Sequence, residues 1–310
     1  MKKLIKRIIK LQNPTVVGLD PTLAYIPEHI KEYYYRQYGK TLRAAARACL
    51  SYNKAIIDAI CDVVPAVKPQ CAYYEAMGWH GVKCLYKTIA YAKKKGMYVI
   101  TDGKRNDICS TMQAYAAAHL GELDVDGELC VPFGADALTV NGYLGTDGIK
   151  PLLDLMEGDP DKGIFVLCKT SNPSSGELQD KLLGDRPLYA AMGDLCERWG
   201  EGTVGKYGYS QVGAVVGATY PAQLAELRGM LPHTFFLVPG YGAQGGGAKD
   251  VAGAFDENGL GAVVNSSRAV LTAWKKQGGS GEGFAQAARA EAIRMRDDIL
   301  SAIPPIRKPR

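Results

Sequence analysis

Residues 97–107 read MYVITDGKRND, and residues 111–119 read TMQAYAAAH. The first stretch opens with apolar and β-branched residues and ends in a charged turn that contains glycine, which is typical of a buried strand. The second stretch has the spacing of a helix. Together they predict one strand followed by one helix, the β/α unit from which parallel sheets are built.

The same alternation occurs eight times along the chain. Near-continuous apolar strands that alternate with helices indicate a parallel sheet buried on both faces. The predicted strands are Thr15–Asp20, Ala66–Tyr73, Met97–Asp102, Ala137–Asn141, Ile164–Lys169, Gly213–Ala218, Phe235–Pro239 and Ala262–Asn265. The predicted helices include Tyr52–Val63, Val82–Lys95, Thr111–His119, Leu188–Trp199, Pro221–Met230 and Phe284–Ile303. Eight such units in 310 residues predict an α/β fold, a closed (β/α)₈ TIM barrel.

An open doubly wound sheet is the competing architecture. It usually places a G-x-G-x-x-G turn after its first strand, whereas residues 18–21 here read GLDP. Residues 22–48 exceed a minimal loop and predict a helical insertion after strand 1. The first ten residues predict a basic amphipathic N-terminal helix instead of a signal peptide, because charges interrupt their apolar positions. With no Pro/Ser-rich linker in the sequence, we expect one domain over residues 1–310.

Composition argues against several classes of protein. No apolar run reaches the ~18 residues of a membrane-spanning helix. The net charge of +5 is spread along the chain, which does not favour nucleic acid as a partner. The eight cysteines form no C-x-x-C pair or Cys/His cluster. We therefore expect buried free thiols in a reducing cytoplasm and no metal site.

Charged residues stand where the predicted strands end, which is the catalytic face of such a barrel. Asp102 and Lys104 lie two positions apart, so on an extended strand they share a face. Neighbouring carboxylates keep a lysine protonated, and a fixed ammonium group can protonate a carbanion. Alone, this pair also fits a surface salt bridge. Lys68 and Asp20 end two neighbouring strands. An array of such charges in a partly dry pocket is costly unless each charge has an opposite neighbour, so it seldom serves stability alone.

Two loops complete the predicted rim. Residues 238–247 read VPGYGAQGGG, and residues 264–268, one strand later, read VNSSR. Glycines that expose backbone N–H groups, together with Arg268, favour a phosphate site over a simple flexible turn, and the glycines also suit a hinged lid. Residues 169–176, KTSNPSSG, either cap the following helix or hydrogen-bond the edge of a base.

Six motifs in this order resemble the orotidine 5′-phosphate decarboxylase family, specifically its longer bacterial subgroup. They are residues 18–21, 67–69, 102–108 with Thr111, 170–173, 238–246 and 265–268. The resemblance implies decarboxylation of orotidine 5′-monophosphate to uridine 5′-monophosphate and CO2, in pyrimidine biosynthesis, without metal or cofactor. The insertion after Asp20 and the extended region 169–184 depart from the family pattern. The resemblance therefore does not decide which residues of 169–184 contact the pyrimidine.

The resemblance also implies residue roles. Lys104 would donate the proton, Asp102 would lie against the departing carboxylate, and Lys68 would link this array to the ribose. Asp107 would reach into the site of a partner subunit, which implies a homodimer. The residues implied for substrate binding are Asp20 for ribose, Ser171 for the pyrimidine edge, Gln244 between base and phosphate, Arg268 for phosphate, and Thr111, Pro239, Gly245 and Gly246 from the matching motifs.

Two alternatives remain open from the sequence. A Mg²⁺-dependent sugar-phosphate enzyme of the same barrel suprafamily shares the D-x-K-x-x-D motif, although Ser171 and Gln244 favour a nucleotide. A non-catalytic nucleotide-binding barrel would bind product tightly without turnover.

Overall fold

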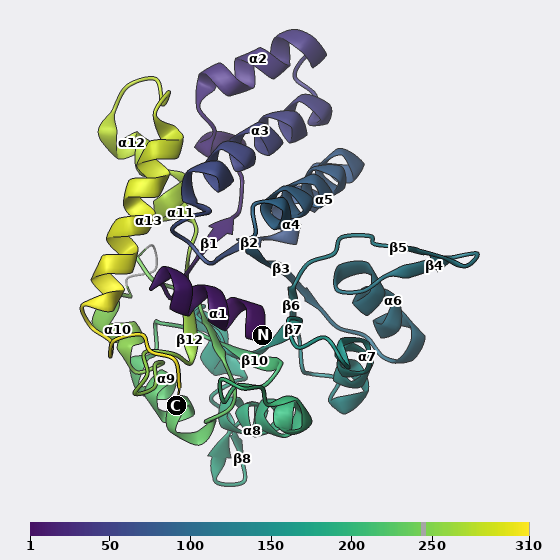
Figure 1. Cartoon of the computed structure of the whole chain (residues 1–310), viewed down its shortest axis with the longest axis vertical. Helices are drawn as coiled ribbons and strands as arrows, with labels where there is room; N and C mark the ends of the chain where they lie inside the picture. Colours follow the sequence, from purple (N-terminus) through teal and green to yellow (C-terminus); the bar gives the residue numbers. More distant parts are fainter. Residues whose placement is uncertain (243–245, 310) are drawn as a thin grey trace.

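Eight parallel strands form a closed barrel in the computed structural model, which describes residues 1–242 and 246–309 (Figure 1). Strand β1 pairs with both β2 and β12, so the sheet has no edge. Around the barrel the strands are β1 (Thr15–Leu19), β12 (Ala262–Ser266), β11 (Phe236–Val238), β10 (Val212–Val216), β7 (Gly163–Lys169), β6 (Ala137–Val140), β3 (Tyr98–Arg105) and β2 (Ala66–Pro69). All eight predicted strands and the TIM barrel are confirmed.

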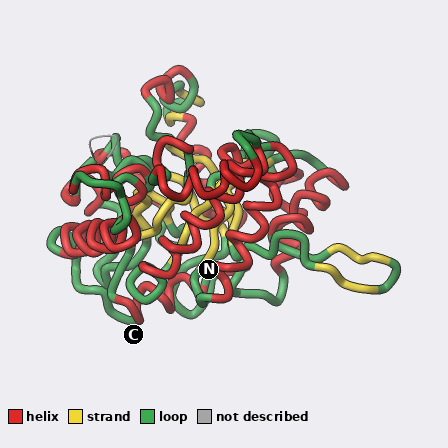
Figure 2. Tube along the Cα trace, turned by 90° about the horizontal axis from the view of Figure 1, so that it is seen from above, coloured by secondary structure: helices red, strands yellow, loops and turns green. Residues whose placement is uncertain are grey.

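Helices surround the strands, as Figure 2 shows from above. The principal ones are α1 (Lys2–Leu11), α2 (Glu28–Tyr38), α3 (Leu42–Ile60), α5 (Gly78–Lys94), α6 (Cys109–His119), α7 (Thr146–Met156), α8 (Leu188–Gly200), α9 (Pro221–Met230) and α13 (Phe284–Leu300). Shorter helices are η1 (Leu23–Tyr25), α4 (Cys71–Glu75), η2 (Pro173–Glu177), η3 (Glu201–Thr203), α10 (Ala248–Ala252), α11 (Arg268–Leu271) and α12 (Ala273–Gln277). The basic first helix and the helical insertion after β1 are confirmed.

Several boundaries differ from the sequence prediction. Strand β2 ends at Pro69, with one isolated bridge from Gln70 to Asp102 beyond it. Residues 71–73 begin helix α4, which the Gln70 side chain caps. Helix α7 was not predicted, since Gly148 and Pro151 interrupt its pattern. Two hairpins, β4–β5 (Leu123–Val125 and Glu128–Cys130) and β8–β9 (Leu182–Leu183 and Arg186–Pro187), were also missed.

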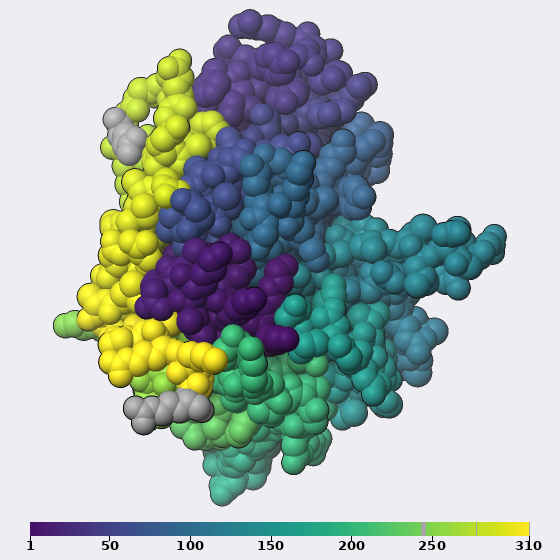
Figure 3. Space-filling model, viewed as in Figure 1, coloured from purple at the N-terminus to yellow at the C-terminus, as the bar shows by residue number. Residues whose placement is uncertain are grey.

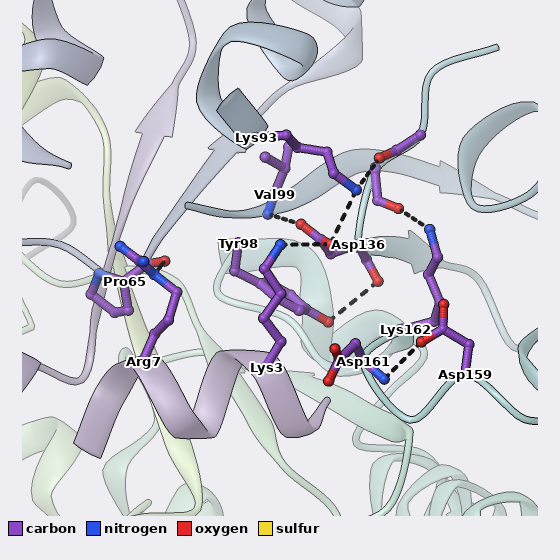
Figure 4. Close-up of polar contacts among 12 residues, drawn as sticks. Lys3, Arg7, Pro65, Lys93, Tyr98, Val99, Asp136, Asp159, Asp161 and Lys162 are labelled. Atoms are coloured by element: carbon purple, nitrogen blue, oxygen red, sulfur yellow. Dashed lines mark hydrogen bonds and ion pairs between the residues drawn. The ribbon is translucent and has the colours of Figure 1, made fainter. Parts of the chain in front are cut away.

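Helix α1 closes the N-terminal end of the barrel through polar contacts drawn in Figure 4. Asp136, directly before β6, accepts hydrogen bonds from Lys3 at 3.1 Å, from Lys93 at 3.2 Å and from the Val99 N–H at 2.8 Å. Arg7 of the same helix donates to the Pro65 carbonyl at 2.9 Å. Hydrogen bonds from charged side chains thus attach helix α1 to the N-terminal end of the barrel, while the C-terminal end remains open.

The cysteine prediction is only partly right. Cys61 is half-buried and Cys109 and Cys130 are exposed, although the other five thiols are buried. Cys61 follows the last residue of α3. Cys109 begins α6 and Cys130 ends β5, and both residues face solvent. Over residues 1–242 and 246–309, no helix combines the length and the apolar character needed to cross a membrane.

Candidate active site

Two lysines meet one carboxylate at the C-terminal end of the barrel. Lys68 at the end of β2 donates to Asp102 Oδ2 at 2.6 Å, and Lys104 donates to Asp102 Oδ1 at 2.6 Å. Adjacent parallel strands deliver the three side chains, since β2 pairs with β3. The Lys68 and Asp102 side chains are buried, whereas that of Lys104 is 46% exposed. The array therefore presents one accessible ammonium group on a buried ion pair.

The backbone at Lys104 is not extended. The alternation of an extended strand, from which we predicted that Asp102 and Lys104 share a face, is therefore not the reason that they meet. Lys104 adopts φ 49°, in the left-handed region, and the register between β3 and β6 shifts between Thr101 and Arg105. A two-residue alternation therefore does not apply here. The Lys104 side chain reaches Asp102 because the backbone turns at that residue, an uncommon conformation for a side chain other than glycine.

Charge compensation fixes the ionisation of the array. Burial alone would raise the pKa of Asp102, but Lys68 and Lys104 together hold it far below its usual range. Burial alone would lower the pKa of Lys68, but the carboxylates of Asp102 and Asp20 raise it overall. Asp102 is therefore an anion and Lys68 a cation at any physiological pH.

Thr139 of β6 belongs to this array and was not singled out in the sequence. Its hydroxyl donates to Asp102 Oδ1 at 2.8 Å and accepts the Lys104 backbone N–H at 3.0 Å. Thr139 is buried. Its position inside the strand that ends before Asn141 is the only sequence signal, and a threonine in a strand is ordinarily structural.

A hollow of about 390 Å³ lies on one side of the array, lined by charged, hydroxyl and amide groups. Two buried acceptors there, Asp20 Oδ1 and Asn265 Oδ1, have no hydrogen-bond partner among the described residues. A ligand that offers hydroxyl donors would satisfy them. The lining residues are Asp20, Tyr25, Lys68, Tyr73, Asp102, Pro239, Gly240, Tyr241, Asn265, Ser267 and Arg268.

A second hollow of about 420 Å³ shares Lys68, Asp102 and Pro239 with the first. The remaining residues that line it are Lys104, Thr139, Leu167, Thr170, Ser171, Asn172, Gln179, Val215 and Leu237. The two hollows thus form one cleft with the Lys/Asp array at the junction. A cleft with one polar end and one end that mixes amides with aliphatic side chains suits a nucleotide.

The loop after β7 lines this second hollow and does not cap a helix. Helix η2 has no side-chain cap hydrogen bond. Instead, the Gln179 side chain forms two hydrogen bonds with Thr170. Its Oε1 accepts the Thr170 backbone N–H at 2.9 Å, and its Nε2 donates to the Thr170 hydroxyl at 2.7 Å. The capping interpretation of this loop is therefore wrong for helix η2, and a contact between the loop and the edge of a base stays a prediction.

Some candidate residues do not line the cleft. Asp107 is half-buried and accepts the N–H of Ile108 at 2.8 Å, and Thr111 is exposed on the first turn of α6. Among the described residues, no hydrogen bond or ion pair joins Lys104 to Asp107. Gly246 is buried and pairs with Tyr241. Gln244 and Gly245 lie outside the described residues.

Comparisons with known proteins show the family of the chain. The family model described as "Orotidine 5'-phosphate decarboxylase / HUMPS family" matches residues 16–278. The chain belongs to this family. The matched region includes every candidate residue from Asp20 to Arg268, while helix α1 and helix α13 lie outside it.

Individual relatives in the orotidine 5′-phosphate decarboxylase family match nearly the whole chain. The orotidine 5′-phosphate decarboxylase of Rhodopirellula baltica is 43% identical over 94% of this chain and 96% of its own. That of Clostridium perfringens is 40% identical over 97% and 98%. The solved OMP decarboxylase of Leishmania donovani is 30% identical, with a TM-score of 0.72 over 96% of both chains.

Proposed function

We propose that this chain decarboxylates orotidine 5′-monophosphate to uridine 5′-monophosphate and CO2 in pyrimidine biosynthesis. The relatives from R. baltica and C. perfringens, which match more than nine-tenths of this chain, are named orotidine 5′-phosphate decarboxylase. The observation that carries the proposal is the Lys68–Asp102–Lys104 array at the junction of a two-lobed cleft.

Lys104 is the proton donor in this proposal. When the bond to the carboxylate breaks, its electron pair remains on the pyrimidine carbon, in an orbital in the ring plane that π-delocalisation cannot reach. A fixed ammonium group stabilises that charge and then transfers a proton to the carbon. The neutral Lys104 amine regains a proton from solvent. The position of Lys104 in the cleft, partly exposed and hydrogen-bonded to a buried anion, supports this role.

Asp102 and Lys68 prepare the site for this step. Asp102 stays ionised beside the place of the substrate carboxylate, so loss of CO2 relieves repulsion between two anions. Binding energy from the distant phosphate offsets that repulsion in the bound substrate. Lys68 neutralises Asp102 from the buried side and leaves Lys104 oriented toward the cleft.

The two hollows divide the substrate between them. We place the ribose hydroxyls at Asp20, whose buried Oδ1 has no partner among the described residues, and the phosphate at Arg268 with backbone amides near Pro239 and Gly246. The pyrimidine then lies in the second hollow, with its edge at Ser171. Gln244 and Gly245 are assigned to base and phosphate on the sequence alone.

Asp107 and Thr111 act across a homodimer interface in this proposal. Both lie outside the cleft of their own chain, and neighbouring Ile108 is exposed. Complementation tests it: inactive Lys104→Ala and Asp107→Ala proteins are mixed, exchanged by dilution and concentrated again. Because one of two sites in each hybrid dimer is intact, about a quarter of the wild-type activity returns. Failure to recover activity in proven hybrids contradicts the shared site.

We further propose one domain, action in the cytoplasm, and catalysis without a metal ion. The decisive experiment mixes purified protein with orotidine 5′-monophosphate, with and without EDTA, and follows the pyrimidine absorbance. The expected result is rapid conversion that EDTA does not change. Product binding without turnover would favour a non-catalytic barrel, and activity that EDTA abolishes and Mg²⁺ restores would favour the sugar-phosphate enzyme.

A further inference from the structure

The β4–β5 hairpin stands away from the barrel (Figure 1, Figure 3). Its aliphatic side chains are exposed to solvent. Leu123 is 55% exposed and Leu129 66% exposed, and Val125 and Val131 are similar. Side chains alternate between the faces of a strand, and Leu129 pairs with Asp124, so Leu123 and Leu129 lie on opposite faces. A two-stranded ribbon is only marginally stable alone, and apolar side chains gathered on an exposed surface mark a site of interaction.

The same hairpin is acidic. Glu122, Asp124, Asp126 and Glu128 are all exposed, and none forms an ion pair with another residue that the structure describes. The Asp124 carboxylate does accept the Gly127 N–H at 2.6 Å, which fixes the turn. The hairpin therefore combines aliphatic and negatively charged side chains on an exposed ribbon. A matching surface would be apolar and basic.

Such a surface lies between helices α3 and α5. A hollow of about 320 Å³ there is lined by Arg43, Ala46, Arg47, Leu50, Trp79, His80, Lys83, Cys84 and Lys87. The floor is apolar, and Trp79 is 66% exposed at its edge. None of the four Arg and Lys side chains forms an ion pair within residues 1–242 and 246–309, and no acidic residue lines the hollow. We call this surface the α3–α5 groove.

We propose that the β4–β5 hairpin of a second copy of this chain docks into the α3–α5 groove. The charges and apolar groups of the two surfaces are complementary, and one chain carries both. The hairpin extends outward from its own barrel (Figure 2), so its tip is available to a second molecule. A reciprocal exchange of two hairpins gives a closed pair with two identical contacts.

The position of the hairpin also agrees with the proposed dimer, on which this inference rests. Helix α6 begins two residues after Asp107 and leads directly into β4. A partner that lies along the exposed side of α6 would reach the Asp107 segment at one end of the helix and the hairpin at the other. Hairpin docking adds a contact that the chemistry at Lys104 does not require, so the two can fail separately.

Charge reversal and its compensation test the contact. One variant combines Arg47→Glu with Lys83→Glu in the groove, and another combines Glu122→Lys with Glu128→Lys in the hairpin, leaving the Asp124 turn intact. Sedimentation equilibrium should show a dimer dissociation constant raised about 10-fold or more in each, because like charges then face each other. The four substitutions together should return the constant to within a few-fold of wild type. The matched control, Lys6→Glu with Lys10→Glu on helix α1, should leave association unchanged.

Trp79 supplies a second readout that does not depend on activity. In wild type, dilution from dimer to monomer should increase quenching of its fluorescence by iodide, and Trp79→Phe should remove that change. The proposal is overturned if the protein is monomeric, if either reversal leaves association unaltered, or if the fourfold variant does not recover it. A groove that binds only small anions, or a hairpin that binds a different protein, would give one of these results. A dimer without decarboxylase activity would refute the proposed function alone.

Discussion

The hydroxyl of Thr139 donates to Asp102 Oδ1 at 2.8 Å, the same oxygen that accepts the Lys104 ammonium at 2.6 Å. The hydroxyl also accepts the backbone N–H of Lys104, which holds that residue at φ 49°. A single buried group therefore fixes both the carboxylate and the backbone that carries the lysine. We infer that Thr139 is a positioning residue for the proposed reaction.

Thr139→Val keeps the shape of the side chain but removes both hydrogen bonds. Turnover should fall about 10- to 100-fold, since a loss of roughly 1.5–3 kcal/mol follows when charged partners lose a hydrogen bond. KM should change little, because Thr139 acts through Asp102 and Lys104. Steady-state kinetics measure the split, and Thr139→Ser, which retains the hydroxyl, should recover most of the activity. A purely structural role would instead lower the melting temperature with kcat preserved in the folded fraction.

Lys104→Ala should abolish nearly all turnover and leave the fold intact, because the side chain is partly exposed and supports no core packing. Circular dichroism and the melting temperature control for folding. Retention of a tenth of the wild-type activity would disprove the assignment of Lys104 as proton donor.

Arg268→Ala should weaken apparent substrate affinity more than it lowers turnover. A charge-assisted contact to phosphate contributes about 1.5–3 kcal/mol, so KM should rise by roughly one to two orders of magnitude. Arg186→Ala is the matched control, since Arg186 pairs with Asp194 on the surface outside the cleft. Equal KM values for Arg268→Ala and wild type would place the phosphate elsewhere.

His119 should make the protein less stable in mild acid. Burial and then the nearby Arg105 charge lower its pKa from 6.5 to about 4. Well above pH 6.5 the histidine is neutral in both the folded and the unfolded state and contributes nothing to the pH dependence. As the pH falls from about 6.5 to about 4, the unfolded chain gains a proton that the folded protein does not, so the free energy of unfolding decreases by up to ~3 kcal/mol.

Urea unfolding at several pH values measures this effect. Between pH 6.5 and 4, the free energy of unfolding should fall less for His119→Leu than for wild type. Both proteins contain the same carboxyl groups, so the effects of these groups cancel when the two free energies are subtracted. Parallel curves over that window would show that His119 is protonated in the folded state.

The barrel was predictable because its strands are apolar throughout and recur with helices between them. The ends of those strands also placed Lys68, Asp102 and Lys104 together. Side-chain partners across the barrel were not predictable: Thr139 meets Asp102 only through the pairing of β3 with β6, and nothing local marks it. Helix α7 was not predicted because its glycine and proline are unfavourable inside a helix. The β4–β5 hairpin was not predicted because its acidic and aliphatic residues do not give a clear strand pattern.

Asp136 gathers Lys3 and Lys93 at one end of the barrel, as Asp102 gathers Lys68 and Lys104 at the other. Because the full height of the sheet separates these two ion clusters, substitutions in one should add to those in the other without coupling. Variants with altered residues at the C-terminal rim, selected to accept other pyrimidines, should therefore keep the full stabilisation that the Asp136 cluster gives to the N-terminal end of the barrel.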